Sequence, residues 1–150
     1  MSVLLAGVAP GMQAVATLVD ELVFHRRRRL SRRERVGHPL DTLTVVLCYT
    51  LTLELAPTPF SLRIYLALAA FSCLFITKDE FVHAAQCGPA EHWLHAVLFV
   101  LHPVVLASAA FLWFHDARGW IVAQAMLTLA FGLYQTMYWN TSWMKPSSTR

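Results

Sequence analysis

Long apolar runs, separated by short polar or proline-containing segments, make up most of the chain. Apolar windows of about 18 or more residues are typical of helices that cross a membrane. Five such segments follow one another, at about residues 3–24, 40–56, 62–77, 94–114 and 120–139. The pattern predicts an all-α integral membrane protein with five transmembrane helices, in one polytopic domain over residues 1–150.

Turn residues separate these segments. Two prolines occur in residues 56–59, and the sequence Cys-Gly-Pro occupies residues 87–89. Proline has no backbone N–H for the hydrogen bond that a helix interior needs, so both places predict the end of one helix and the start of the next. Gly37 and Pro39 predict a bend followed by the first turn of the second helix.

Acids and histidines recur at helical spacing in and beside the apolar segments. Residues three or four positions apart lie on the same face of a helix. Four carboxylate–imidazole pairs have this spacing, one for each of the first four helices: Glu21 with His25, His38 with Asp41, Asp79 with His83, and Glu91 with His95. Asp20 lies about 100° around the helix from Glu21, so it is either a partner of the first pair or an interface residue.

The fifth segment has neither an acid nor a histidine. Its polar residues Gln124 and Gln135 lie close to one face, and Tyr134 and Trp139 near its inner end predict an aromatic belt at the membrane interface. Two further titratable residues, Glu54 and His115, lie toward the opposite end of the predicted bundle, so we leave them out of any site.

Composition supports the membrane prediction. Apolar residues make up 57% of the chain and charged residues only 14%, whereas ordinary soluble domains have about 25% charged residues. An ordinary soluble domain is therefore excluded. The three cysteines, Cys48, Cys73 and Cys87, contain no CxxC pair and predict no disulfide framework.

Basic residues are concentrated in one predicted loop, since seven of the twelve lysines and arginines lie in residues 26–35. Lys and Arg prefer cytoplasmic loops, so we expect the N-terminus outside and the C-terminus and all four pairs on the cytoplasmic side, in a bacterial inner membrane. The block adjoins two predicted spans and has no interleaved aromatic residues. We therefore expect it to contact anionic lipid and not nucleic acid.

Acids and histidines are costly beside lipid unless they pair, face a cavity or bind a cation. One such pair near an interface is typical of a salt bridge, but four pairs at the same depth predict a metal site inside a bundle of helices 1–4. The predicted ligands are Glu21, His25, His38, Asp41, Asp79, His83, Glu91 and His95, with His92 either a ligand or a partner of one. Glu80 and His102 are also expected to be catalytic residues. Glu80 would accept a proton, and His102 lies about 10 Å deeper than His95 on the same stripe.

Oxygen and nitrogen ligands in this number suit two or three ions, with iron favoured and manganese or zinc as alternatives. The favoured function is a di-iron oxidoreductase that acts on a lipid or other hydrophobic substrate and uses an electron donor. In composition the chain resembles the histidine-rich membrane hydroxylases and desaturases, although E-x-x-x-H pairs stand in place of their HxxHH boxes.

Two other functions remain open at this point. A zinc- or manganese-dependent hydrolase of a lipid ester or phosphate could use Glu80 as the base, with the arginine loop holding an anionic head group. A divalent-metal transporter or sensor needs a path across the outer half of the membrane. The outer halves of the first four helices are almost wholly apolar, which favours an enzyme over a transporter.

Overall fold

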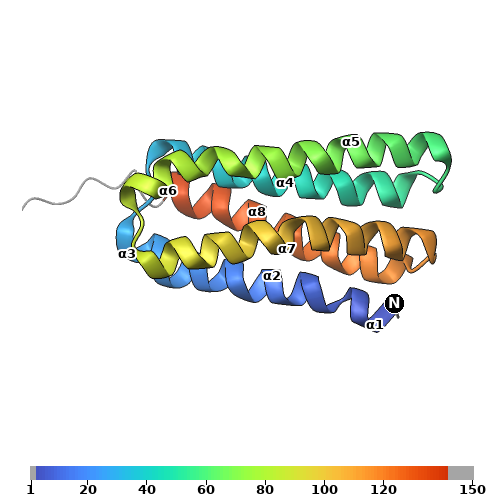
Figure 1. The fold of residues 1–150 in the computed structure, drawn as a ribbon, viewed down its shortest axis with the longest axis horizontal. Coiled ribbons are helices and arrows are strands. Elements are labelled where there is room, and N and C mark those ends of the chain that lie inside the picture. The colour runs from blue at the N-terminus through green and yellow to red at the C-terminus, as the bar shows by residue number, and fades with distance from the viewer. Residues whose placement is uncertain (1–2, 142–150) are drawn as a thin grey trace, which may run out of the picture.

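The structure is a computed structural model that describes residues 3–141, and it is an elongated bundle of five helical rods (Figure 1). The rods are α1 (Val3–Ala6), α2 (Val8–Val19), the π-helical η1 (Asp20–His25) and α3 (Arg26–Arg28); α4 (Arg32–Glu54); α5 (Pro59–Phe75), the 3-10 helix η2 (Ile76–Asp79) and α6 (Glu80–Gln86); α7 (Pro89–Phe114); and α8 (Arg118–Thr141). The prediction of an all-α chain is confirmed.

Three helical stretches of the described chain are long and apolar enough to cross a membrane: Val3–Arg28, Pro59–Asp79 and Pro89–Phe114. The outward faces of the rods are apolar as well, with Leu66, Leu74, Val100 and Leu127 more than half exposed. Such surfaces suit lipid contact. The helices α4 and α8 are not among these three stretches. Crossing by all five rods therefore stays a prediction.

The bundle has an apolar end and a polar end. Packing is most extensive between α4 and α8 and between α2 and α7, and α4 also packs on α5. The buried apolar core, which includes Tyr49, Tyr65 and Leu112, occupies the half next to the 56–58 turn and the α7–α8 turn. The other half holds the buried acids and histidines, close to α3 and α6 (Figure 1).

The second rod begins earlier than its proline suggests. We expected a helix start near Pro39, but α4 begins at Arg32 and continues through Pro39. Ser31 is the N-cap: its hydroxyl accepts a hydrogen bond from the Glu34 amide, and the Glu34 carboxylate accepts one from the Ser31 amide. This reciprocal cap stabilises a start seven residues upstream of the proline.

The other predicted breaks lie where expected. The helix α5 begins at Pro59 after Thr58, whose side chain caps the helix together with that of Ser61. At the second predicted break, the turn between α6 and α7, α6 ends at Gln86 and α7 begins at Pro89. The second of these turns directs the chain back into the bundle at the polar end.

Candidate metal centre

The first rod leaves α-helical geometry where its acids and histidine lie. The segment Asp20–His25 is π-helical, so residues five positions apart align along its axis. Asp20 and His25 therefore face each other, with Asp20 Oδ2 3.1 Å from His25 Nε2. Glu21 Oε2 lies 3.3 Å from His25 Nδ1, so both acids reach one imidazole ring.

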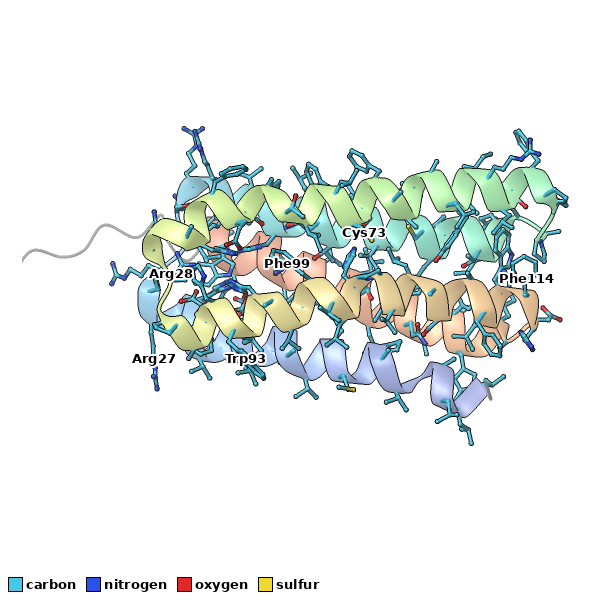
Figure 2. All side chains as sticks on the ribbon, in the orientation of Figure 1. Arg27, Arg28, Cys73, Trp93, Phe99 and Phe114 are labelled. Carbon is cyan, nitrogen blue, oxygen red and sulfur yellow. The ribbon has the colours of Figure 1, made fainter. Side chains whose placement is uncertain are left out.

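Three other segments converge on the same place. The N-terminal part of α4 brings Glu34, His38 and Asp41, while η2 and α6 bring Asp79 and His83. The start of α7 adds Glu91 and His95, which are both about 4% exposed. Figure 2 shows nitrogen and oxygen atoms gathered between the helices at this end, which also carries Arg27 and Arg28. The residues of all four carboxylate–imidazole pairs thus lie at this end of the bundle.

Four imidazole rings form a closed circuit at the centre of the cluster. The centroids of His83 and His95 are 3.9 Å apart and those of His25 and His38 are 4.9 Å apart. The two stacked pairs are joined by His25–His95 and His38–His83 separations of 6.2 and 6.3 Å. Four imidazolium ions this close would repel one another strongly, and neutral imidazole is the form that binds metal.

Several of these rings have nitrogen atoms without hydrogen-bond partners. Among the described residues the unpaired buried atoms include His25 Nε2, His38 Nε2, both ring nitrogens of His83, and His95 Nδ1. Buried polar groups are almost always bonded, so each exception needs an explanation. A metal ion would satisfy lone pairs that no protein donor reaches.

His25 and His95 show how the acids prepare these lone pairs. When Nδ1 of His25 donates to Glu21, its Nε2 presents a lone pair to Asp20 Oδ2, 3.1 Å away. Two acceptors at this distance need either a proton or a metal ion between them. His95 Nε2 lies 3.1 Å from Asp20 Oδ1, so donation there leaves Nδ1 free. A carboxylate that fixes one nitrogen and exposes the other is the usual support of a metal-binding histidine.

The cluster carries an excess of negative charge. Six carboxylates surround the rings, from Asp20, Glu21, Glu34, Asp41, Asp79 and Glu91. In the described structure their direct cationic partners are Arg28, which bonds to Glu34 at 2.6 Å and Glu91 at 3.1 Å, and Lys78, which bonds to Asp41 at 2.6 Å. With neutral histidines, four negative charges remain uncompensated. Two divalent ions would neutralise them.

Two of the four metal-capable groups in the described structure share no residue with each other. One group, the Asp20 set, is Asp20, His25, Glu91 and His95, and the other, the Glu34 set, is Glu34, His38 and His83. Within each set the ligand atoms lie within 4.8 Å of one another, close to the roughly 4.4 Å that separates two ligands across one ion. Two histidines and one carboxylate, as in the Glu34 set, typically bind non-haem Fe(II).

Asp79 and Asp41 form a further group with His38. Asp79 Oδ2 lies 3.5 Å from His38 Nδ1, and Asp41 Oδ2 lies 3.9 Å from it. Both carboxylates also bond to Lys78. They can therefore orient His38. They can also bind a metal ion beside His38 in place of Lys78.

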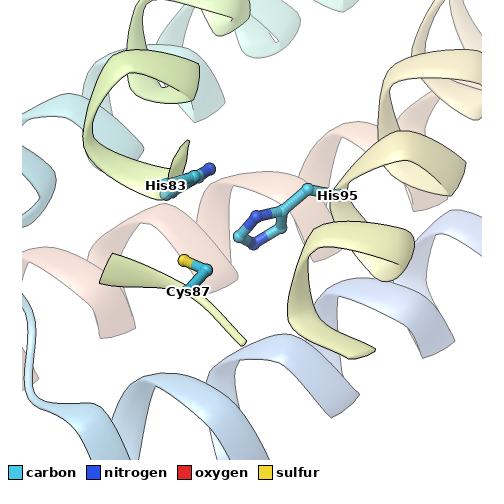
Figure 3. Close-up of side chains that lie close together, drawn as sticks. All are labelled: His83, Cys87 and His95. Carbon is cyan, nitrogen blue, oxygen red and sulfur yellow. The ribbon is translucent and has the colours of Figure 1, made fainter. Parts of the chain in front are cut away.

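Cys87 was not predicted to take part, yet it lies at the edge of the site. Figure 3 shows Cys87 beside His83 and His95, and one ligand atom from each of the three residues lies within 4.8 Å of the other two. Burial, followed by the nearby Glu91, raises the pKa of the Cys87 thiol to about 12. The thiol is therefore protonated unless a metal ion binds it.

Glu34 is a ligand candidate that the sequence analysis missed. It lies four residues before His38, which is a helical spacing, but we took this segment for a loop. It is fully buried. Burial alone raises the pKa of Glu34, but the neighbouring His83, Arg28 and Ser31 outweigh it and hold the pKa well below its usual range. The capping spacing of Ser31 and Glu34 was a signal in the sequence for this helix start.

Glu21 has both oxygens engaged by protein groups. Its Oε1 accepts hydrogen bonds from Trp139 Nε1 at 2.7 Å and from the Tyr134 hydroxyl at 3.2 Å. Trp139 is only 1% exposed, so the prediction that it belongs to an interface belt is wrong. Its indole packs inward, where it donates the hydrogen bond to Glu21. The fifth rod thus contributes to the centre without a ligand of its own.

Besides Glu21, three predicted residues lie apart from the metal-capable groups of the described chain. Glu80 is exposed. His92 Nε2 donates to the backbone carbonyl of His83 at 2.7 Å, so His92 positions the segment that carries His83. His102 is buried deeper, where its Nε2 lies 2.9 Å from Ser72 Oγ. The roles predicted for these three stay predictions.

A cavity of about 630 Å³ extends from the histidines along the bundle. Residues of α2, η1, α4, η2, α6, α7 and α8 line it, from His25, His38, His83 and His95 at one end to Gly7 and Trp120 at the other. Most of its walls are apolar, and His102 lies on its lining between the two ends. The centre is therefore accessible to an apolar molecule along the length of the bundle.

In comparisons with protein-family models, curated proteins and solved structures, nothing matches this chain.

Proposed function

We propose that this protein is an integral membrane oxidoreductase with a dinuclear iron or manganese centre and a hydrophobic substrate. The observation that carries the proposal is the combination of unpaired, buried imidazole nitrogens with the closed end of an apolar cavity. Unpaired lone pairs and the excess of carboxylates over Arg28 and Lys78 favour bound cations, and the cavity favours a substrate that comes from the bilayer.

The residues present fit such a pair of ions. The Asp20 set and the Glu34 set each combine imidazole nitrogen with carboxylate oxygen, and helical bundles hold two iron or manganese ions with the same ligand types. When bound, such a pair supplies oxygen activation and electron transfer. The chain itself orients the rings through Asp20, Glu21 and His92, and its apolar walls exclude water from the substrate.

The structure also supports oxidation over the two alternatives. Hydrolysis needs a free base and access for a charged phosphate or a water, but Glu80 is exposed away from the rings and Arg28 is bound to Glu34 and Glu91. A metal transporter needs polar ligands along its path. The cavity beyond His102 offers mainly apolar side chains and amides.

We further propose that the centre lies on the cytoplasmic side of the membrane. The exposed residues Arg27, Arg32 and Arg33 lie near the same end of the bundle as the rings, and positive charge favours that side. An electron donor would then reach the centre from the cytoplasm.

The test is the metal content per chain of the detergent-purified protein, measured by elemental mass spectrometry. We expect about two equivalents of iron or manganese in the natural protein, as two ligand sets imply, and loss of most of both in the double variant His83→Ala/His95→Ala. Each substitution removes a ligand from a different set. The natural protein should then consume oxygen when a lipid substrate is present.

His115→Ala is the matched control, because His115 lies at the opposite end, where its Nδ1 donates to the Phe111 carbonyl at 2.8 Å. This variant should keep its metal. Stoichiometric zinc in the natural protein would favour the hydrolase. Folded protein without metal, and without uptake of added iron or manganese, would reduce the cluster to salt bridges and refute the proposal.

A further inference from the structure

The cavity has two unsatisfied hydrogen-bonding atoms far from the metal centre. Gln13 Oε1 on α2 and Gln124 Nε2 on α8 are buried and have no partner among the described residues, and both side chains line the cavity. Tyr49 donates its hydroxyl hydrogen to Gln124 Oε1 at 3.0 Å. This bond fixes the Gln124 amide so that its NH2 group stays unpaired.

The two amides lie at nearly the same depth. The helices α2 and α8 both run from the apolar end to the polar end (Figure 1), and a methyl group at Gly7 would come within 3.2 Å of the Trp120 ring. From this level Gln13 lies six residues along and Gln124 four, or about 9 and 6 Å of helix rise. An acceptor and a donor therefore face the same part of the cavity.

The cavity opens sideways, between α2 and α8. The helix α2 packs on α7 and α8 packs on α4, so α2 and α8 meet chiefly at the two ends of the cavity. One end is closed by Gly7 and Trp120, and the other by the hydrogen bonds of Tyr134 and Trp139 to Glu21. Between these ends the lining residues Gly11, Ala14, Leu18, Ala123 and Leu127 are exposed on the surface.

We propose that this lateral opening admits a long-chain alcohol from the bilayer, whose hydroxyl group binds between Gln13 and Gln124. An alcohol hydroxyl can satisfy both atoms, because it donates to Gln13 Oε1 and accepts from Gln124 Nε2. A hydrocarbon would leave both amide atoms unpaired in an apolar cavity, which is costly.

The alcohol then lies lengthwise in the cavity. Gln13 is seven residues before Asp20 on the same rod, or about 10 Å of helix rise. The carbons next to the hydroxyl extend from this level through the cavity past His102 toward His25 and His95. That the alcohol is the substrate of the metal centre rests on the proposed function; that it binds does not.

The test is photoaffinity labelling of the purified protein in lipid nanodiscs with a 16-carbon alcohol that carries a diazirine in its chain. We expect saturable labelling of peptides from α2 and α8. Unlabelled 1-hexadecanol should compete at least about tenfold better than hexadecane, since only the alcohol pairs both amides. In the double variant Gln13→Leu/Gln124→Leu, which keeps a similar side-chain volume, this preference should disappear.

Two variants test the cavity itself. An added Cβ at Gly11 meets nothing within 4 Å, so Gly11→Phe should place its ring in open cavity space and abolish saturable labelling. Ala123→Phe does the same from α8, should Gly11→Phe not fold. The control is Val15→Phe, which adds an equal ring to α2 at an exposed position outside the cavity lining and should label like the natural protein.

Labelling that does not saturate in the natural protein, or that continues in both filled-cavity variants, would overturn the binding site. Equal competition by hexadecanol and hexadecane would overturn the role of the two glutamines. Metal content, measured on the same samples, separates the two proposals. Metal without saturable labelling refutes only the alcohol site, and saturable labelling without metal refutes only the metalloenzyme.

Discussion

The four histidine rings are held to different degrees by the protein. His25 has an acid beside each nitrogen, whereas neither nitrogen of His83 has a hydrogen-bond partner in the described chain. The ring of His83 is positioned by stacking on His95 and by the bond of His92 to its backbone carbonyl. A bound ion should therefore fix the position of the His83 ring more than that of the His25 ring.

Arg28 compensates the acids when metal is absent. Its guanidinium bonds to Glu34, which is fully buried, and to Glu91. Removing one partner of a buried pair leaves an uncompensated charge, so Arg28→Met should lower the free energy of unfolding of the metal-free protein by about 3 kcal/mol. The metal-loaded protein should lose less, because the ions offset the same carboxylates. Thermal unfolding with and without metal measures both values.

Arg27→Met is the control for this change, since the Arg27 side chain is exposed and projects away from the bundle (Figure 2). It should alter the free energy of unfolding by no more than about 0.5 kcal/mol. An equal loss in both variants would show that Arg28 acts through the general charge of the loop and not through Glu34 and Glu91.

At the scale of whole elements, the segments that carry the first pair and Asp79 of the third pair depart from α-helical geometry. The segment η1 is π-helical and η2 is a 3-10 helix. In a regular α-helix, Asp20 and His25 would lie about 140° apart around the axis. The π-helical turn lets both carboxylates reach His25. Such local distortion is often found at functional sites, where it is retained because side chains need it.

The packing of α8 on α4 depends on a glycine. A Cβ at Gly132 would lie 2.9 Å from Thr42 Cγ2, and a β-branched side chain cannot readily move aside. Gly132→Ala should therefore destabilise the protein by about 1–3 kcal/mol, although alanine normally favours a helix. The melting temperature in detergent reports the loss.

The second change Thr42→Ser removes the clashing methyl group and keeps the hydroxyl that donates to Gln135 Oε1 at 2.9 Å. The double variant Gly132→Ala/Thr42→Ser should recover most of the stability. Gly119→Ala serves as the control, because a Cβ there meets nothing within 4 Å. If the double variant stays as unstable as Gly132→Ala, the close contact with Thr42 is not the cause.

At the scale of the whole molecule, the two ends of the bundle differ in chemistry. The metal-capable groups lie toward the end of α3 and α6, and the start of α1 lies toward the other end (Figure 1). With five rods crossing, the N-terminus and the C-terminal end of α8 face opposite sides of the membrane. Because arginines favour the cytoplasm, a green fluorescent protein fused to the C-terminus should fluoresce in bacterial cells.

Alkaline phosphatase fused at the same place should be inactive, since it folds only outside the cytoplasm, and phosphatase fused after Thr58 should be active. An active C-terminal phosphatase fusion together with an inactive one after Thr58 would invert the orientation. Activity at both places would mean that α5 with α6, α7 and α8 do not cross an odd number of times.

Much of the architecture follows from the order of residues alone. Apolar runs and their proline breaks predict the helical rods, because a helix in lipid must satisfy its backbone bonds internally and cover itself with apolar side chains. Helical spacing likewise places His25, His38, His83 and His95 on inward faces. These are local properties, read within one helix at a time.

Tertiary structure decided what spacing within one helix cannot show. Asp20 joins the site only through the π-helical turn, Glu34 only because α4 begins at Arg32, and Cys87 only because the turn before α7 folds over His83. The inward position of Trp139 depends on a carboxylate more than a hundred residues away. Each of these contacts depends on how separate helices rotate and approach, and helical period carries no information about that.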